Sequence, residues 1–144
     1  MLGICRYHTG DFAGAEAAFR LVSQAVPLNE VYNNLGAAQS RQNSPETLES
    51  FRKALEGDSA DPDYHFNLGY ALWKRGLLEA AADSFRAALA RKPSDAEATT
   101  MLGRCLNRSV PRPGDPRSDG LERLKLNYEE TAYRQLKAEL GVKE

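Results

Sequence analysis

The sequence predicts an all-α fold of stacked helix-turn-helix units, and three observations support this prediction. The dipeptide Leu-Gly recurs at intervals of 33, 33 and 34 residues, with its glycines at Gly3, Gly36, Gly69 and Gly103. Seven residues after each of the first three comes a residue that readily forms a tight turn: Gly10, Asn43 and Gly76. Between these landmarks the apolar residues follow a helical period and do not alternate as in a strand. A fixed period of this length is typical of a repeat protein.

The first two units share a second pattern, in which a small residue precedes a phenylalanine by four positions. Ala15 and Phe19 form this pair in the first unit, which Pro27 ends, and Thr47 and Phe51 form it in the second. The second unit is about one residue short before its second helix. Met1 stands at the sixth position of a repeat, so we expect either a trimmed or partial chain or a natural start with a short first helix.

The third unit shows the helical pattern most clearly. Its first helix places Phe66, Tyr70 and Trp73 on one face, and Gly76 ends it. The second helix carries an apolar stripe that includes Ala81 and, four residues later, Phe85, and it stops before Pro93. These features predict two helices joined by a tight turn.

The repeat pattern changes after the first helix of a fourth unit. Ser94 and Glu97 have the spacing of a capping box, which predicts a helix that runs to about Asn107 and completes a repeat stack over residues 1–107. Residues 108–118 hold three prolines and a glycine and are expected to form a loop. Leucines spaced by three and four then predict a long helix over residues 119–141, which would close the stack.

Composition excludes several functional classes. The 144 residues include 19 Lys and Arg against 20 Asp and Glu, a net charge of −1 that argues against a nucleic-acid binder held by bulk charge. No apolar run approaches the roughly 20 residues of a membrane span, and no signal peptide is evident. With its cysteines expected to be free, the chain is predicted to be soluble, and the cytoplasm is the favoured location.

The residues needed for catalysis or metal binding are scarce. The two cysteines, Cys5 and Cys105, occupy equivalent small helix positions three units apart, so they are expected to be free core thiols. The two histidines, His8 and His65, occupy non-equivalent positions, and neither belongs to a nucleophile motif. We therefore expect no metal, no cofactor and no enzymatic activity.

The landmarks resemble the tetratricopeptide repeat family, whose 34-residue pattern is W-x2-L-G-x2-Y…A-x3-F…P. The third unit matches it best, with His65, Leu68, Gly69, Leu72, Ala81, Phe85 and Pro93. The resemblance covers residues 1 to about 107. It implies a right-handed superhelical solenoid, in which each helix pair buries its apolar face against the next. It also implies a role in protein–protein interaction.

In the resembled family the first helix of each unit lines a concave groove. Carried over to this chain, the predicted partner-binding residues are Asn33, Asn34, Ala37, Arg41, Phe66, Asn67, Tyr70, Trp73, Lys74, Arg104 and Arg108. One subgroup grips a C-terminal carboxylate of heat-shock chaperones with basic residues. Here Asp63 and Met101 stand at those positions, so this clamp is not expected.

The aromatic row of the third unit leaves three alternatives open. Phe66, Tyr70 and Trp73 form either a groove for a partner peptide or helix, or a core covered by the chain's own C-terminal helix, or a surface for self-association. The expected function is that of an adaptor or scaffold for another protein or peptide. The alternatives are a secretion or assembly chaperone and a substrate-recruiting module of a larger enzyme. Self-association through the poorly capped N-terminal end is a further expectation.

Overall fold

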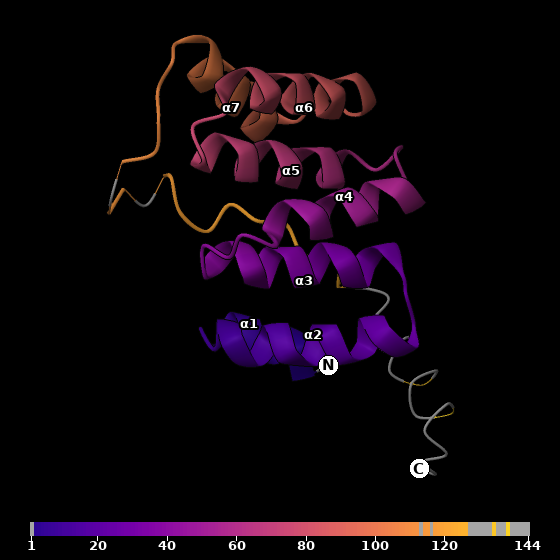
Figure 1. The fold of residues 1–144 in the computed structure, drawn as a ribbon. Helices are drawn as coiled ribbons and strands as arrows, with labels where there is room; N and C mark the ends of the chain where they lie inside the picture. The colour runs from indigo at the N-terminus through magenta and orange to yellow at the C-terminus, as the bar shows by residue number, and fades with distance from the viewer. Residues whose placement is uncertain (1, 113, 116, 127–133, 135–137, 139–144) are drawn as a thin grey trace. The chain divides into compact units, whose positions relative to one another are not determined.

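A computed structural model describes residues 2–112, 114–115, 117–126, 134 and 138. Within these residues it contains seven helices and no strand (Figure 1). The helices are α1 (Leu2–His8), α2 (Phe12–Ala25), α3 (Asn29–Arg41), α4 (Thr47–Gly57), α5 (Pro62–Lys74), α6 (Leu78–Arg91) and α7 (Ala96–Leu106). The chain divides into two compact units. Unit 1 comprises Met1–Gly57 with Leu124–Glu144, and unit 2 comprises Asp58–Arg123.

In unit 1 each helix packs on the next, and a repeated glycine sets how closely they approach. A β-carbon added to Gly36 of α3 would lie 2.6 Å from the ring of Phe51 in α4, and Gly3 faces Phe19 in the same way. The turn between α3 and α4 uses Asn43 at φ 55°. The glycines of the Leu-Gly landmarks and the phenylalanines that follow them are thus packing contacts of the helix pairs.

Unit 2 repeats this arrangement with α5 and α6 and adds α7, which packs on α6. Gly69 of α5 faces Phe85 of α6, and Gly76 turns the chain at φ 77°. Helix α5 begins after Asp61, whose side chain accepts a hydrogen bond from the main chain of Asp63. Helix α7 is capped by Asp95 and not by the predicted Ser94: the Asp95 carboxylate accepts from the Ala98 amide at 3.2 Å.

The predicted all-α class of helix-turn-helix repeats is confirmed, but the predicted C-terminal helix does not begin at Asp119. Residues 121–126 have no regular secondary structure, and Gly120 has φ 72°, outside the helical region. Side chains of other helices hydrogen-bond this main chain and so compete with helix formation. Of residues 127–141, Arg134 and Ala138 are helical, and the other positions lie outside the described residues.

The glycine contacts give a matched pair of substitutions. Gly36→Ala should destabilise the chain by roughly 1–3 kcal/mol, because the new methyl group collides with the Phe51 ring. Gly103 occupies the equivalent position in α7, but no described atom lies within 4 Å of its added β-carbon. Gly103→Ala should therefore stabilise by about 0.5–1 kcal/mol through helix propensity alone. Urea unfolding measures both. Equal effects at the two positions would contradict the packing explanation.

Candidate functional site

The aromatic row of α5 is buried under a non-helical segment of unit 2 that follows α7, made up of the described residues between Ser109 and Arg123 (hereafter the segment). Phe66 and Tyr70 are fully buried, and Trp73 is 1% exposed. The Trp73 indole Nε1 donates to the carbonyl of Ser109 at 2.7 Å, and the Tyr70 hydroxyl donates to the carbonyl of Ser118. The aromatic row is therefore covered by the chain itself, which is one of the three alternatives that the sequence left open. The residues that cover it do not form the predicted C-terminal helix.

Asn67 binds the main chain of this segment in both directions. Its amide Nδ2 donates to the carbonyl of Arg123 at 2.8 Å, and its Oδ1 accepts from the Arg123 amide, also at 2.8 Å. One carboxamide thus satisfies both main-chain groups of a single residue, as a neighbouring strand does in a sheet. Asn67 itself is fully buried, so both of its polar ends need these partners.

The same device occurs in unit 1. Asn34 of α3 donates to the carbonyl of Lys125 at 2.8 Å and accepts from the Lys125 amide at 2.8 Å. Its buried neighbour Asn33 donates to the Asn34 Oδ1 at 3.2 Å, which leaves the Nδ2 of Asn34 directed at the main chain. Ala37, one turn further along α3, is also fully buried.

Arg123 occupies a pocket of unit 2 built for a guanidinium group. Its two terminal nitrogens contact the two carboxylate oxygens of Asp95 at 2.7 and 2.8 Å, and one of them also contacts Asp63 at 3.0 Å. The guanidinium lies 3.7 Å from the centre of the Phe66 ring. The hydrogen bonds from Arg123 hold the pKa of Asp95 below its ordinary value, against the opposing effect of burial.

Two more basic residues of unit 2 hold the segment near Tyr70 and Trp73. Lys74 lies 3.8 Å from the carboxylate of Glu122, whose side chain has no exposed surface. Arg104 of α7 donates to the carbonyl of Arg117 at 3.0 Å, and its guanidinium lies 5.7 Å from the Trp73 ring. The site is thus aromatic at its floor and charged at its edges.

Comparison with known proteins decides the family. A sequence profile for the tetratricopeptide repeat matches residues 37–96 and 79–109, which together span just over half of the chain. The chain belongs to the tetratricopeptide repeat family. Such repeats serve generally as scaffolds for protein–protein interaction, are typically non-enzymatic, and bind other proteins or peptides.

Among solved structures, the crystal structure of MamA is similar to this tetratricopeptide repeat chain. The TM-score is 0.70 at 24% sequence identity, over 96% of this chain and 74% of that chain. At this identity the likeness shows the fold alone. No curated protein sequence matches significantly.

The structure brings together most of the residues that the sequence predicted for a groove. In unit 2 the aromatic row is joined by Asn67, Lys74 and Arg104. Arg108 lies elsewhere: it is exposed, has φ 55°, and stands 3.7 Å from Glu79 of α6. In unit 1 the guanidinium of Arg41 covers the ring of Phe12 at 4.5 Å.

The sequence did not predict the residues that complete the site. These are Asp63 and Asp95 on the helix side, and Ser118, Glu122 and Arg123 on the segment. The family resemblance places Asp63 at a groove-facing position, but its ion pair with Arg123 was not predicted. No local pattern indicates the other four, because their partners lie far away in the sequence.

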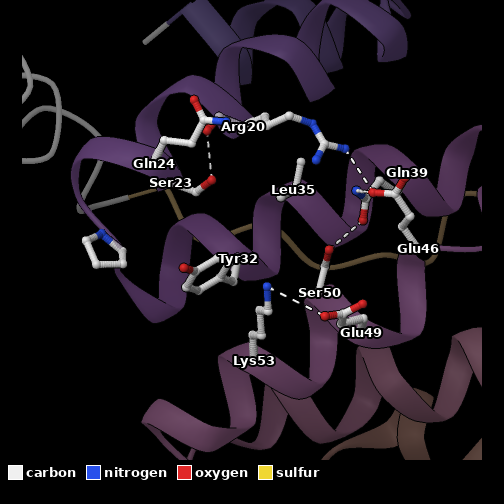
Figure 2. A pocket seen from close by; sticks show the side chains of 11 residues that line it. Arg20, Ser23, Gln24, Tyr32, Leu35, Gln39, Glu46, Glu49, Ser50 and Lys53 are labelled. Atoms are coloured by element: carbon white, nitrogen blue, oxygen red, sulfur yellow. Dashed lines mark hydrogen bonds and ion pairs between the residues drawn. The ribbon is translucent and has the colours of Figure 1, made fainter.

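A separate hollow of about 530 Å³ lies in unit 1 (Figure 2). It is lined by Arg20, Ser23, Gln24, Pro27, Tyr32, Leu35, Gln39, Glu46, Glu49, Ser50 and Lys53. Its charged side chains pair with one another, as Figure 2 shows: Arg20 with Glu46 at 3.0 Å and Lys53 with Glu49 at 3.7 Å. This balance leaves little net charge to select a ligand.

Two further observations concern membrane spans and metal sites. None of the described helices is long and apolar enough to cross a membrane. Within the described part of the chain, no three His, Cys, Asp or Glu residues form a group that could hold a metal ion. Cys105 is buried as expected, whereas Cys5 is exposed, and both are free thiols.

The Asp95–Arg123 pair predicts a pH-dependent contribution to stability. Because the pKa of Asp95 is lowered on folding, this contribution is complete above its ordinary value of 3.8 and is lost as the pH falls through the lowered value. Asp95→Asn keeps the helix cap but removes the charge. The substituted chain should be less stable than wild type at about pH 6, and the difference should shrink towards about pH 3. Urea midpoints at both pH values test this. A constant difference would contradict it.

Proposed function

We propose that this tetratricopeptide repeat chain is an adaptor whose α5–α7 face receives an extended segment of a partner protein. The observation that supports the proposal is the pair of hydrogen bonds between Asn67 and the main chain of Arg123. A carboxamide that binds main-chain groups can accept a residue of any type, provided that its backbone is extended and unpaired.

The other polar contacts also favour an extended ligand over a helical one. Tyr70, Trp73 and Arg104 each donate to a main-chain carbonyl of the segment. In a helix nearly all carbonyls are already bonded within the helix, so a helical ligand could not accept this set of donors. The face therefore fits a peptide in extended conformation.

The floor of the site provides the apolar contribution to binding. Phe66, Tyr70 and Trp73 present one continuous aromatic row along α5, and tyrosine and tryptophan are enriched among residues that dominate binding energy. In unit 1, Asn33, Asn34, Ala37 and Arg41 are proposed as the corresponding surface of α3, with Asn34 as the main-chain contact.

The test selects peptides on a chain whose own segment is weakened. We define the opened variant as the full chain with Glu122→Ala and Arg123→Ala, which removes segment side chains and leaves the helices unchanged. This background is needed because, in wild type, a substitution on the α5–α7 face would weaken the binding of the internal segment and the binding of the peptide together. A random peptide library displayed on phage is panned against the opened variant, and enriched peptides are synthesised.

Addition of Asn67→Ala should weaken the selected peptides about tenfold to a hundredfold, since it removes two hydrogen bonds. Asn107→Ala, the same change at an exposed position at the end of α7, is the matched control and should leave affinity within about twofold. Titration calorimetry measures both. Peptides that bind equally well to the Asn67→Ala chain would contradict this function.

A further inference from the structure

The pocket around Arg123 recognises a particular side chain, whereas Asn67 recognises only main chain. Both carboxylate oxygens of Asp95 accept hydrogen bonds from the two terminal nitrogens of the Arg123 guanidinium, whose carbon lies over the Phe66 ring at 3.7 Å from its centre. This fork and stack geometry suits arginine and does not suit lysine, whose ammonium is a single point charge. Unit 2 therefore contains a specific arginine subsite.

The residue before the arginine meets the opposite charge. Glu122 lies buried beside Lys74, whereas Arg123 lies between Asp63 and Asp95. Successive side chains of an extended chain point to opposite sides, so neighbouring residues can reach different partners. Exchange of the two residues would place each charge beside a group of its own sign. The face thus distinguishes Glu-Arg from Arg-Glu.

The segment is held as a ligand is held, mainly by polar contacts. Ser118 and Glu122 are its buried members, whereas Leu121 is only half-buried. The segment includes three prolines and two glycines in its sequence, and its described residues contribute no helix to the packing of unit 2. The helix pairs rest instead on contacts such as Gly69 with Phe85.

We infer that residues 117–123 are an internal ligand of unit 2, and that the partner which replaces them carries an acidic residue followed directly by arginine in an extended segment. This inference rests on the proposed function and specifies its ligand. The internal segment competes with the partner at the high effective concentration that a short connection provides. A partner must therefore match Glu122 and Arg123 in chemistry in order to displace them.

The probe is a synthetic peptide with the sequence of residues 117–126, Arg-Ser-Asp-Gly-Leu-Glu-Arg-Leu-Lys-Leu. It should bind the opened variant at least about tenfold more tightly than wild type, because only wild type retains the full internal competitor. The matched control is the same peptide with the Glu and Arg exchanged, which has identical composition and charge. It should bind the opened variant at least about tenfold more weakly than the native order.

A second comparison, between two substitutions in the opened variant, tests whether Asp95 forms the arginine subsite. In the opened variant, Asp95→Asn should weaken the native-order peptide at least about tenfold, whereas Asp83→Asn on the exposed face of α6 should have no effect. Circular dichroism checks that each variant keeps its helices. If the opened variant does not fold, Arg123→Gln replaces it. Loss of helices in both would overturn the inference, because a displaceable ligand does not hold the helices folded.

The remaining outcomes separate this inference from the function on which it rests. Equal affinity of the peptide for wild type and the opened variant would contradict the inference that the internal segment competes with a partner. Equal binding of the two peptide orders would overturn the Glu-Arg specificity while leaving peptide binding in place. Failure of every peptide, including those selected from the library, to bind the opened variant would overturn the proposed function as well.

Discussion

The two hydrogen bonds between Asn67 and the main chain of Arg123 are the interaction on which the site depends. A fully buried carboxamide without partners would cost roughly 1–3 kcal/mol, and so would a buried main-chain donor or acceptor. The hydrogen bonds between the Asn67 side chain and the Arg123 main chain remove this free-energy cost for both groups. The face of α5 is therefore more stable when a chain with unpaired main-chain groups lies on it, as the protein's own segment does.

The charged contacts add selectivity to this main-chain contact. Asp95 has two roles in unit 2, because its carboxylate caps the first turn of α7 and also receives the guanidinium of Arg123. The side chain of Asp95 therefore couples the start of α7 to the position of the segment. Lys74 and Glu122 form the second ion pair, and its burial makes an unmatched charge at either position unfavourable.

The sequence predicted the features that repeat and missed those that occur once. The Leu-Gly landmarks and the following phenylalanines recur every 33 or 34 residues, so their packing role follows from periodicity, as Gly36 against Phe51 shows. The family resemblance placed Asn34, Asn67 and the aromatic row on the expected face. The segment was missed because Leu121 and Leu124 have helical spacing, while the contacts that hold it in a non-helical conformation reach 56 residues back to Asn67. Local patterns carry no information about such distant partners.

Amide hydrogen exchange at Arg123 tests the central claim most directly, since this amide is the one that donates to the Asn67 side chain. The full-length wild-type chain should exchange it at least about a hundredfold more slowly than the same sequence does when unstructured, and Asn67→Ala should abolish this protection. The helical amides of α5 serve as an internal reference for global stability in both proteins. Exchange of the Arg123 amide at the unstructured rate in wild type, with α5 still protected, would contradict the account.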